Sequence, residues 1–223
     1  MDAELKTRAQ RAGEELADAP ADEILRWAID EFGTKLVVAA SMAEAVLVDM
    51  LSRERSDIPV VFIDTGYHFA ETLGTRDAVR HQYELPLISV GPQLTVAGQD
   101  AVYGPRLHER DPDACCRMRK VVPLDRALAP YSAWAAGSRR SETAGRKEIR
   151  VVDWDARRGM VKVHPLANWS DDDVARYVDQ HNVIVNPLLS DGYDSIGCRP
   201  CTARGVGRDG RWAGLGKAEC GIH

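Results

Sequence analysis

The chain has 223 residues, a formal net charge of −5, 44% apolar residues and 28% charged residues. That length can bury the core of one sizeable domain, and the composition is that of an ordinary globular protein. The acidic balance disfavours a general nucleic-acid binder, which normally carries a basic surface. No apolar run reaches about 18 residues, and residues 1–6 lack the apolar core of a signal peptide. We therefore expect a cytoplasmic protein without a membrane or nucleic-acid partner.

The first two predicted helices cover residues 4–17 and 21–31, with Pro20 between them. Downstream, short apolar runs alternate with helical segments. Strands are predicted over residues 36–40, 59–63, 87–90, 131–136 and 161–164, with helices over 43–54 and 69–82 between the first three. A last helix follows Asn168, with Ser170 as its N-cap and three aspartates in its first turn, where the helix dipole favours acids.

This order of elements predicts the fold class. Strands that alternate with helices of about 10–15 residues indicate an α/β fold with a doubly wound, mostly parallel sheet flanked by helices. We expect a single domain, made of N-terminal helices over residues 1–35, an α/β core over 36–185 and a flexible, Gly- and Pro-rich arm over 186–223. The sequence leaves the oligomeric state open, with a homo-oligomer among the options.

The turn after the first strand, Ala40-Ser41-Met42-Ala43-Glu44, has two interpretations. Ser41 and Glu44 have the spacing of a capping box, which is a sufficient structural reason for both residues. Alternatively, exposed N–H groups at the start of the next helix bind a phosphate or sulfate group. The turn lacks the glycines of a strong phosphate-binding loop, so both interpretations stay open.

Asp64-Thr65-Gly66 follows the second predicted strand. Ligands of open α/β sheets lie outside the carboxyl ends of the strands, where the strand order reverses. These three residues are therefore candidates for the same ligand pocket as the turn at Ser41. The structural alternative is an ordinary turn.

Basic residues gather in three segments despite the acidic net charge. Residues 115–124 contain Arg117, Arg119 and Lys120 and no acid, and residues 197–208 contain three arginines and no acid. A third cluster over residues 139–150 mixes five basic residues with two glutamates. Local positive charge on an acidic protein indicates a small anionic ligand. The alternative is that these side chains are simply solvated.

Five cysteines in a chain without secretory context are more often metal ligands or catalytic groups than disulfides. Cys198 and Cys201 have the two-residue spacing of a metal knuckle. Cys115 and Cys116 are adjacent on a predicted helix N-capped by Asp113, where neighbouring side chains diverge by about 100°. That divergence suits an iron–sulfur cubane better than a single ion, and structural zinc is the alternative.

If the other four cysteines are metal ligands, Cys220 is the remaining thiol and a candidate nucleophile. Gly214, Gly216 and Gly221 would allow the arm to swing. Attack of a thiolate on a sulfur atom, followed by displacement by a second thiol, is ordinary sulfur-exchange chemistry. The alternative is an incidental thiol on a frayed chain end.

Together these residues resemble the phosphoadenylyl/adenylyl sulfate reductase family, and specifically its assimilatory adenylyl sulfate (APS) reductase branch. The resemblance covers nearly the whole chain from about residue 36, and the two cysteine pairs with the terminal motif are its most specific parts. The matching segments are Asp64-Thr65-Gly66-Tyr67-His68-Phe69, Cys115-Cys116-Arg117-Met118-Arg119-Lys120-Val121, Gly137-Ser138-Arg139-Arg140, Val163-His164-Pro165-Leu166, Asn186-Pro187-Leu188, Gly192-Tyr193-Asp194-Ser195-Ile196-Gly197-Cys198-Arg199-Pro200-Cys201-Thr202 and Glu219-Cys220-Gly221-Ile222-His223.

The resemblance implies a nucleotide-binding fold of the adenine nucleotide alpha hydrolase (PP-loop) type. It implies one [4Fe–4S] cluster on Cys115, Cys116, Cys198 and Cys201, which organises the site without passing electrons. It further implies that Cys220 attacks the sulfur of APS, expels AMP and becomes an S-sulfocysteine, from which a thioredoxin-type dithiol releases sulfite.

The resemblance also assigns roles to residues around the substrate. Lys120, four residues after Cys116, resembles the residue that links the cluster and the substrate electrostatically. The arginines resemble sulfate and phosphate ligands of the family. The implied substrate-binding set is Ser41, Asp64, Thr65, Gly66, Gly137, Arg139, Arg140, Arg146, Arg208, Arg211 and His223.

The sequence departs from the family pattern in three places. The turn at Ser41 is a degenerate ATP pyrophosphatase-type loop, so ATP cleavage is not expected. Ile222 replaces the usual leucine, and His164 stands where asparagine is common.

Three rival functions remain. The first is a reductase of 3′-phosphoadenylyl sulfate (PAPS), a type of enzyme that usually lacks the cysteine pairs. The second is an ATP-using adenylyltransferase or tRNA-thiolating enzyme, and the third is a zinc-stabilised binding module without chemistry.

Overall fold

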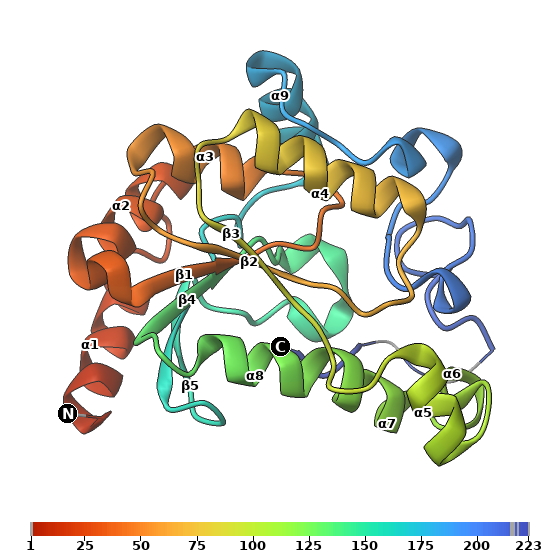
Figure 1. Cartoon of the computed structure of the whole chain (residues 1–223). Coiled ribbons are helices and arrows are strands. Elements are labelled where there is room, and N and C mark those ends of the chain that lie inside the picture. The colour runs from red at the N-terminus through yellow and green to blue at the C-terminus, as the bar shows by residue number, and fades with distance from the viewer. Residues whose placement is uncertain (1, 215–216, 218, 223) are drawn as a thin grey trace.

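The computed structural model describes residues 2–214, 217 and 219–222, and its centre is a six-stranded sheet (Figure 1). The strand order is β3-β2-β1-β4-β6-β5. All neighbouring strands are parallel except β5, which pairs antiparallel with β6. The strands are β1 (Leu36–Ala39), β2 (Val60–Ile63), β3 (Leu87–Val90), β4 (Ala133–Ala136), β5 (Val152–Asp155) and β6 (Met160–Val163).

The central strands are apolar at every position because both faces of the sheet are covered. Leu36 and Val38 of β1 belong to one buried cluster, whereas Val37 belongs to another on the opposite face with Trp134. Alternating side chains point to opposite faces of a strand, so a strand buried on both sides reads as a continuous apolar run. This is why sequence analysis finds these strands without ambiguity.

Helices cover both faces. Side chains of α1 (Asp2–Glu15), α2 (Ala21–Phe32), α3 (Val46–Glu54), α4 (Ala70–Gln82) and α9 (Asp171–His181) pack into the larger buried cluster on one face. On the other face, α8 (Val122–Leu128) packs Leu124 and Leu128 against Val37 and Trp134. Figure 1 shows α3 and α4 above the sheet and α8 below it. The predicted doubly wound α/β fold is confirmed.

The chain reaches α8 through a series of short helices. These are α5 (Val96–Tyr103), α6 (Leu107–Arg110), α7 (Pro112–Cys116) and a π-helical turn over Arg117–Val121. The 3₁₀ segments of the chain are Gly33–Lys35, Arg140–Glu142, Ala144–Arg146, Pro187–Asp191 and Arg199–Cys201. A π-helical turn within a helix is uncommon and is found mostly at functional sites. Here it lies directly after the first cysteine pair.

Two predicted helix caps are wrong. The N-cap of α7 is Asp111, whose carboxylate accepts a hydrogen bond from the Ala114 amide at 2.9 Å, and not Asp113. No capping box forms between Ser41 and Glu44, because α3 begins only at Val46 and Glu44 accepts from the Val46 amide. The predicted cap of α9 is confirmed, since the Ser170 hydroxyl accepts from the Asp173 amide.

Sequence analysis finds five of the strands and misses β5. Val152, Asp153, Trp154 and Asp155 carry two acids in four residues, which is typical of a strand at a sheet edge and weak as a strand signal. No helix among the described residues is long and apolar enough to cross a membrane.

Candidate active site

A cavity of about 330 Å³ opens at the carboxyl ends of β1, β2 and β4. The chain runs from β1 outward through β2 to β3 and then returns to place β4 on the other side of β1. The strand order therefore reverses at β1, which is where open α/β sheets bind their ligands. The cavity lining includes the last residue of each of the three strands, namely Ala39, Ile63 and Ala136.

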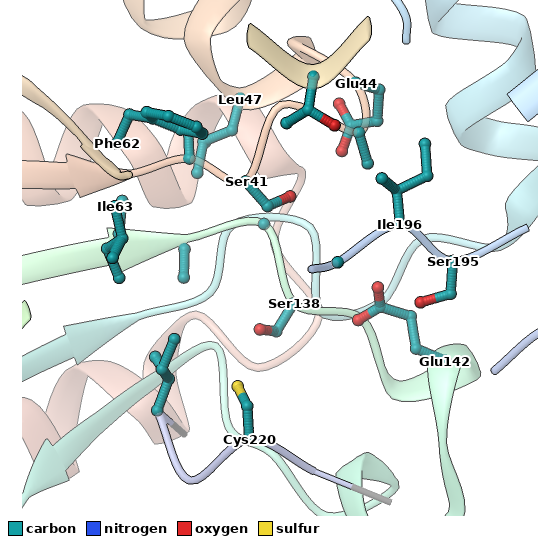
Figure 2. Close-up of a pocket in the computed structure, with 18 of the residues that line it drawn as sticks. Ser41, Glu44, Leu47, Phe62, Ile63, Ser138, Glu142, Ser195, Ile196 and Cys220 are labelled. Carbon is teal, nitrogen blue, oxygen red and sulfur yellow. The ribbon is translucent and has the colours of Figure 1, made fainter. Parts of the chain in front are cut away.

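One wall of the cavity is apolar. Leu47, Phe62 and Ile63 lie together in Figure 2, and Leu124 and Trp134 also line the cavity. Ser41, Ser138 and Ser195 lie further along, with Glu44 and Glu142. Ligand pockets commonly combine an apolar wall with a few convergent polar groups, and this one has the size and character for a nucleoside joined to an anionic group.

Five cations line the polar end of the cavity: Lys120, Arg139, Arg146, Arg208 and Arg211. Lys120 is 8% exposed. Burial acts to lower the pKa of Lys120, but the thiols of Cys198 and Cys220 outweigh it and leave the pKa above its ordinary value. The lysine is therefore charged at neutral pH, and its charge lies close to both a metal-ligand candidate and the candidate nucleophile.

Trp212 organises part of this charge. The indole is 2% exposed, and Arg211 stacks on it with its guanidinium carbon 4.5 Å from the ring centroid. The ammonium groups of Lys120 and Lys217 lie 5.7 Å from the same ring. Cations are attracted to the face of an indole ring, so this one residue gathers positive charge that would otherwise repel itself.

Gly197 explains how Arg211 reaches the cavity. A Cβ atom at Gly197 would lie 2.2 Å from the Arg211 Nη2 atom, so only glycine allows the guanidinium to lie against this backbone. Arg211 Nη1 also donates to the Ser195 hydroxyl and to the Ile196 carbonyl, each at 3.2 Å. Burial lowers the pKa of Arg211 below its ordinary value.

The tail, by which we mean residues 217 and 219–222, lies against the cavity. Glu219 forms ion pairs with Arg146 and Arg208, and Cys220 and Ile222 line the cavity. Figure 2 shows the Cys220 sulfur pointing inward, toward Ser138. A half-buried thiol beside Lys120 has the surroundings of a reactive cysteine.

The other four cysteines form a second group next to this cavity, which we call the four-cysteine group (Cys115, Cys116, Cys198 and Cys201). Three of them are buried, and Cys201 is half-buried. Burial raises the pKa of Cys115 to about 12, and the other three thiols act in the same direction. Burial, with Cys198 next, raises the pKa of Cys201 to about 11. As free thiols, Cys115 and Cys201 resist ionisation, and a bound cation would reverse this.

The four-cysteine group draws on distant parts of the chain. Cys115 and Cys116 end α7, whereas Cys198 and Cys201 flank a 3₁₀ turn that is tied to the β2–α4 loop. The Arg199 amide donates to the Tyr67 carbonyl at 2.7 Å, and the Cys198 thiol lies 3.3 Å from the Thr65 hydroxyl. Thiols in a polar, hydrogen-bonded shell match the donor set of an iron–sulfur cluster.

Among the described residues, no group of three or more His, Cys, Asp or Glu side chains could hold a metal ion. The thiolates of a cubane each bind a different iron atom, so they stand further apart than ligands that share one ion. Four thiols from two segments of the chain are the donor set that a [4Fe–4S] cubane takes, so the donor chemistry of the four-cysteine group fits that cluster.

Comparison with known proteins gives the family. The phosphoadenosine phosphosulfate reductase domain model matches residues 35–204. The chain is 54% identical to adenosine 5′-phosphosulfate reductase of Streptomyces coelicolor and 50% identical to that of Mycolicibacterium smegmatis, in each case over 99% of this chain and 95% of the relative. The chain belongs to the phosphoadenosine phosphosulfate reductase family. The resemblance found in the sequence is confirmed.

Solved structures agree with this family. The phosphate complex of phosphoadenylyl-sulfate (PAPS) reductase from Candida auris matches with a TM-score of 0.76 and 27% identity, over 87% of this chain and 96% of that one. Candida glabrata FMN adenylyltransferase, in complex with FAD and inorganic pyrophosphate, matches with a TM-score of 0.61 and 14% identity, over 90% of this chain and 67% of that one. The second match shows the fold alone.

The structure brings most of the predicted site residues to the cavity, where the lining includes Ser41, Thr65, Lys120, Gly137, Arg139, Arg146, Arg208, Arg211 and Cys220. Asp64, Gly66 and Arg140 lie outside the lining. The Arg140 guanidinium instead donates to the Ile149 carbonyl and the Asn168 side chain. His223 lies outside the described residues.

Asp64, Thr65 and Gly66 form a tight turn next to both the cavity and the four-cysteine group. The Asp64 carboxylate accepts from the Gly66 amide at 2.9 Å, and Gly66 has a φ of +72°. Arg119, which is 2% exposed, donates from Nε to the Thr65 carbonyl at 2.7 Å. Only Thr65 of the three lines the cavity, so the turn mainly supports the site.

Sequence reasoning assigned no ligand role to three residues that line the cavity, Glu44, Glu142 and Ser138. It also assigned none to Trp212, whose ring lies beside Lys120 and Arg211. Burial raises the pKa of the Glu44 carboxyl, which lies in the lining beside Gly137. Glu142 accepts from the Arg139 amide and pairs with Arg146. The mixed signs of charge over residues 139–150 were the available signal, since acids among clustered arginines indicate that some arginines are paired.

Proposed function

We propose that this protein reduces adenosine 5′-phosphosulfate (APS) to sulfite and AMP, as one step of sulfate assimilation. The observation that carries this proposal is a cysteine, Cys220, that lines the same cavity as an apolar wall and a set of buried cations. A nucleoside fits the apolar wall, and the phosphosulfate group fits the cationic end. The names of the bacterial relatives support the same substrate.

The reaction then runs through Cys220 as nucleophile. Its thiolate attacks the sulfur of the sulfate group, an S–S bond forms, and the bond from sulfur to the bridging oxygen breaks. AMP leaves with the electron pair, and Cys220 becomes an S-sulfocysteine. The first thiolate of a thioredoxin-type dithiol attacks the Cys220 sulfur and releases sulfite, and the second thiol resolves the mixed disulfide. The dithiol supplies both electrons.

Lys120 and Arg211 stabilise the charge that develops on the leaving phosphate. Both side chains are buried and line the cavity with Cys220. Cations fixed in a desolvated site favour a developing anion more strongly than the same cations in water. Ser41 and Ser138 supply hydroxyl donors at the same end of the strands.

We further propose that the four-cysteine group holds a [4Fe–4S] cluster. When bound, the cluster ties α7 to the turn of Cys198 and Cys201 and so fixes one side of the cavity without passing electrons to the substrate. Lys120 interacts electrostatically with Cys116 and Cys198 of this group and also with Cys220. Its charge is thus positioned to serve both groups.

The alternative substrate is PAPS, which has a phosphate on the ribose 3′ oxygen. The PAPS reductase of Candida auris favours it through its structural similarity. The two bacterial relatives named for the APS substrate, at 54% and 50% identity, favour APS over PAPS.

The experiment is an anaerobic assay of sulfite and AMP release from APS and from PAPS, with thioredoxin or dithiothreitol as reductant. We expect turnover of APS, weak or no turnover of PAPS, and an SO₃ adduct on the Cys220 peptide when the dithiol is omitted. Iron and acid-labile sulfide are counted on the same sample, with about four irons per chain expected for a cubane. Turnover without an adduct on Cys220 would refute the mechanism, and stoichiometric zinc would refute the cluster.

A further inference from the structure

The geometry points to a role for Glu219 in positioning the nucleophile. Its carboxylate anchors the tail to the cavity through Arg146 and Arg208 and thereby aims the neighbouring Cys220 at the substrate. This inference rests on the proposed function, because it takes Cys220 as the attacking group. It also changes the division of labour among the arginines that the family resemblance assigns to substrate binding.

Both carboxylate oxygens of Glu219 accept hydrogen bonds from side chains of the core. Arg146 donates to both of its carboxylate oxygens, from Nε and Nη2, each at 3.0 Å. Arg208 Nη2 donates to Oε2 at 3.2 Å, and the Thr143 hydroxyl donates to Oε1 at 3.3 Å. Two parallel bonds from one guanidinium fix both the distance and the orientation of a carboxylate. Burial favours a higher pKa for Glu219, but the two arginines outweigh it and hold the pKa below 4.5.

The position of Arg146 makes it a rigid anchor. Its side chain is 10% exposed, and its remaining terminal nitrogen, Nη1, pairs with Glu142. The guanidinium is therefore held between two carboxylates, one from the core and one from the tail. Because Glu142 also accepts from the Arg139 amide at 2.9 Å, the anchor is tied to the loop that follows β4. The tail thus docks against a part of the fold that is already fixed.

Cys220 lies between two attachment points. On one side is Glu219, and on the other Ile222 packs against the apolar cluster that contains Val37 and Trp134. Gly221 between them has a φ of +76°, which turns the chain from one point to the other. With both neighbours held, the inward direction of the Cys220 sulfur in Figure 2 follows from the backbone.

Two of the other cations that line the cavity stay available for an anionic ligand. Glu142 and Glu219 neutralise Arg146, and Glu219 also pairs with Arg208. Lys120 and Arg211 line the same cavity, and neither forms an ion pair with a carboxylate of a described residue. We therefore assign Lys120 and Arg211 to the substrate and Arg146 to the tail. If Glu219 instead blocked the substrate site, its removal would strengthen nucleotide binding.

The test compares Glu219→Gln with the wild-type holoenzyme. The amide keeps the shape and loses the charge, so the tail should detach more often. We expect kcat to fall about tenfold or more, because hydrogen bonds to charged groups are the stronger ones. KM for APS and Kd for AMP should stay within about twofold. Alkylation of Cys220 by iodoacetamide, mapped by mass spectrometry, should be faster in the variant.

Two further variants separate positioning from general damage. Glu219→Asp retains the charge and should recover part of the lost kcat. Glu15→Gln makes the same chemical change in a solvent-exposed ion pair, in which the Glu15 side chain is 58% exposed and the Arg11 side chain 78%. This variant should leave all readouts unchanged. Iron content is measured in every variant, so that loss of the cluster is recognised.

Three outcomes would overturn the inference. The first is an unchanged kcat and an unchanged alkylation rate in Glu219→Gln. The second is tighter AMP binding together with a higher kcat in that variant, and the third is loss of iron in both Glu219→Gln and Glu219→Asp. The alkylation measurement does not need APS. If the wild-type protein fails to turn over APS, the proposed function fails, while the docking of the tail is still judged by the reactivity of Cys220.

Discussion

The two cysteine-bearing regions of this protein are held in place by different forces. The four-cysteine group lies on helix α7 and on a 3₁₀ turn, with three of its thiols buried. A backbone hydrogen bond from Arg199 to Tyr67 ties the 3₁₀ turn to the β2–α4 loop. The tail with Cys220 has no helix or strand among its described residues and is held by ion pairs and by Ile222. Regions held by buried side chains and backbone hydrogen bonds open rarely, whereas a segment held by a few side-chain contacts opens more easily.

This difference matches what the proposed chemistry needs. A cluster site should stay closed throughout the reaction, because its ligands must not exchange. A nucleophile that first meets APS and then a protein dithiol must be presented to two partners in turn. Lys120 interacts electrostatically with cysteines of both regions. The following changes test whether the two regions act independently.

The largest expected effect is that of Cys220→Ser. Without the thiol there is no attack on sulfur, so turnover should fall by at least about three orders of magnitude. Iron content and AMP affinity should match the wild type, because Cys220 is assigned to neither. The measurements are sulfite release, iron counting and equilibrium binding. Loss of iron in this variant would show that the partition of the five cysteines is wrong.

Lys120→Ala removes a charge that interacts with cysteines of both regions. We expect kcat to fall about a hundredfold, the scale seen when one preorganised donor is removed from an active site. The cluster should remain, as judged by visible absorption and iron content. Wild-type kinetics would contradict the role of Lys120, and loss of the cluster would mean that Lys120 belongs mainly to the four-cysteine group.

Gly197→Ala tests the close contact between the segment next to Cys198 and Arg211, which lines the cavity. The added Cβ would collide with Arg211, so we expect the protein to lose about 1–3 kcal/mol of unfolding free energy and part of its activity. Gly74→Ala is the matched control. Nothing lies within 4 Å of a Cβ there, and Gly74 is inside α4, so it should gain about 0.5–1 kcal/mol. Equal effects of the two changes in urea unfolding would contradict the close approach.

The smallest effect is a pH dependence confined to the tail. Because the folded-state pKa of Glu219 lies below 4.5, its contribution to docking is fully present above pH 4.5 and is lost as the pH falls through the lowered value. Hydrogen-exchange protection of the described tail residues, expressed relative to an unstructured peptide, should be constant from neutral pH down to pH 4.5 and fall below it. A decline that starts near neutrality would show that another group controls docking.

Much of the fold follows from local sequence signals. The central parallel strands are apolar throughout because helices bury both faces, and the Ser170 cap is a feature of a few neighbouring residues. Predictions that were wrong concern choices between near neighbours. Asp111 and Asp113 are both acceptable caps for a helix that contains Cys115, and only the path of the chain selects Asp111.

The sequence by itself determined the α/β class, the family and the five cysteines that carry the proposed chemistry. It also indicated that arginine clusters surround an anion, because charge and spacing are readable along the chain. Only the tertiary structure decided which arginines face the cavity and which are paired. Arg140 turns away to Ile149 and Asn168, while Arg146 meets Glu219 across 73 positions of sequence. Such pairs depend on the order of the strands in the sheet, which brings distant loops to one edge, and no local pattern records that order.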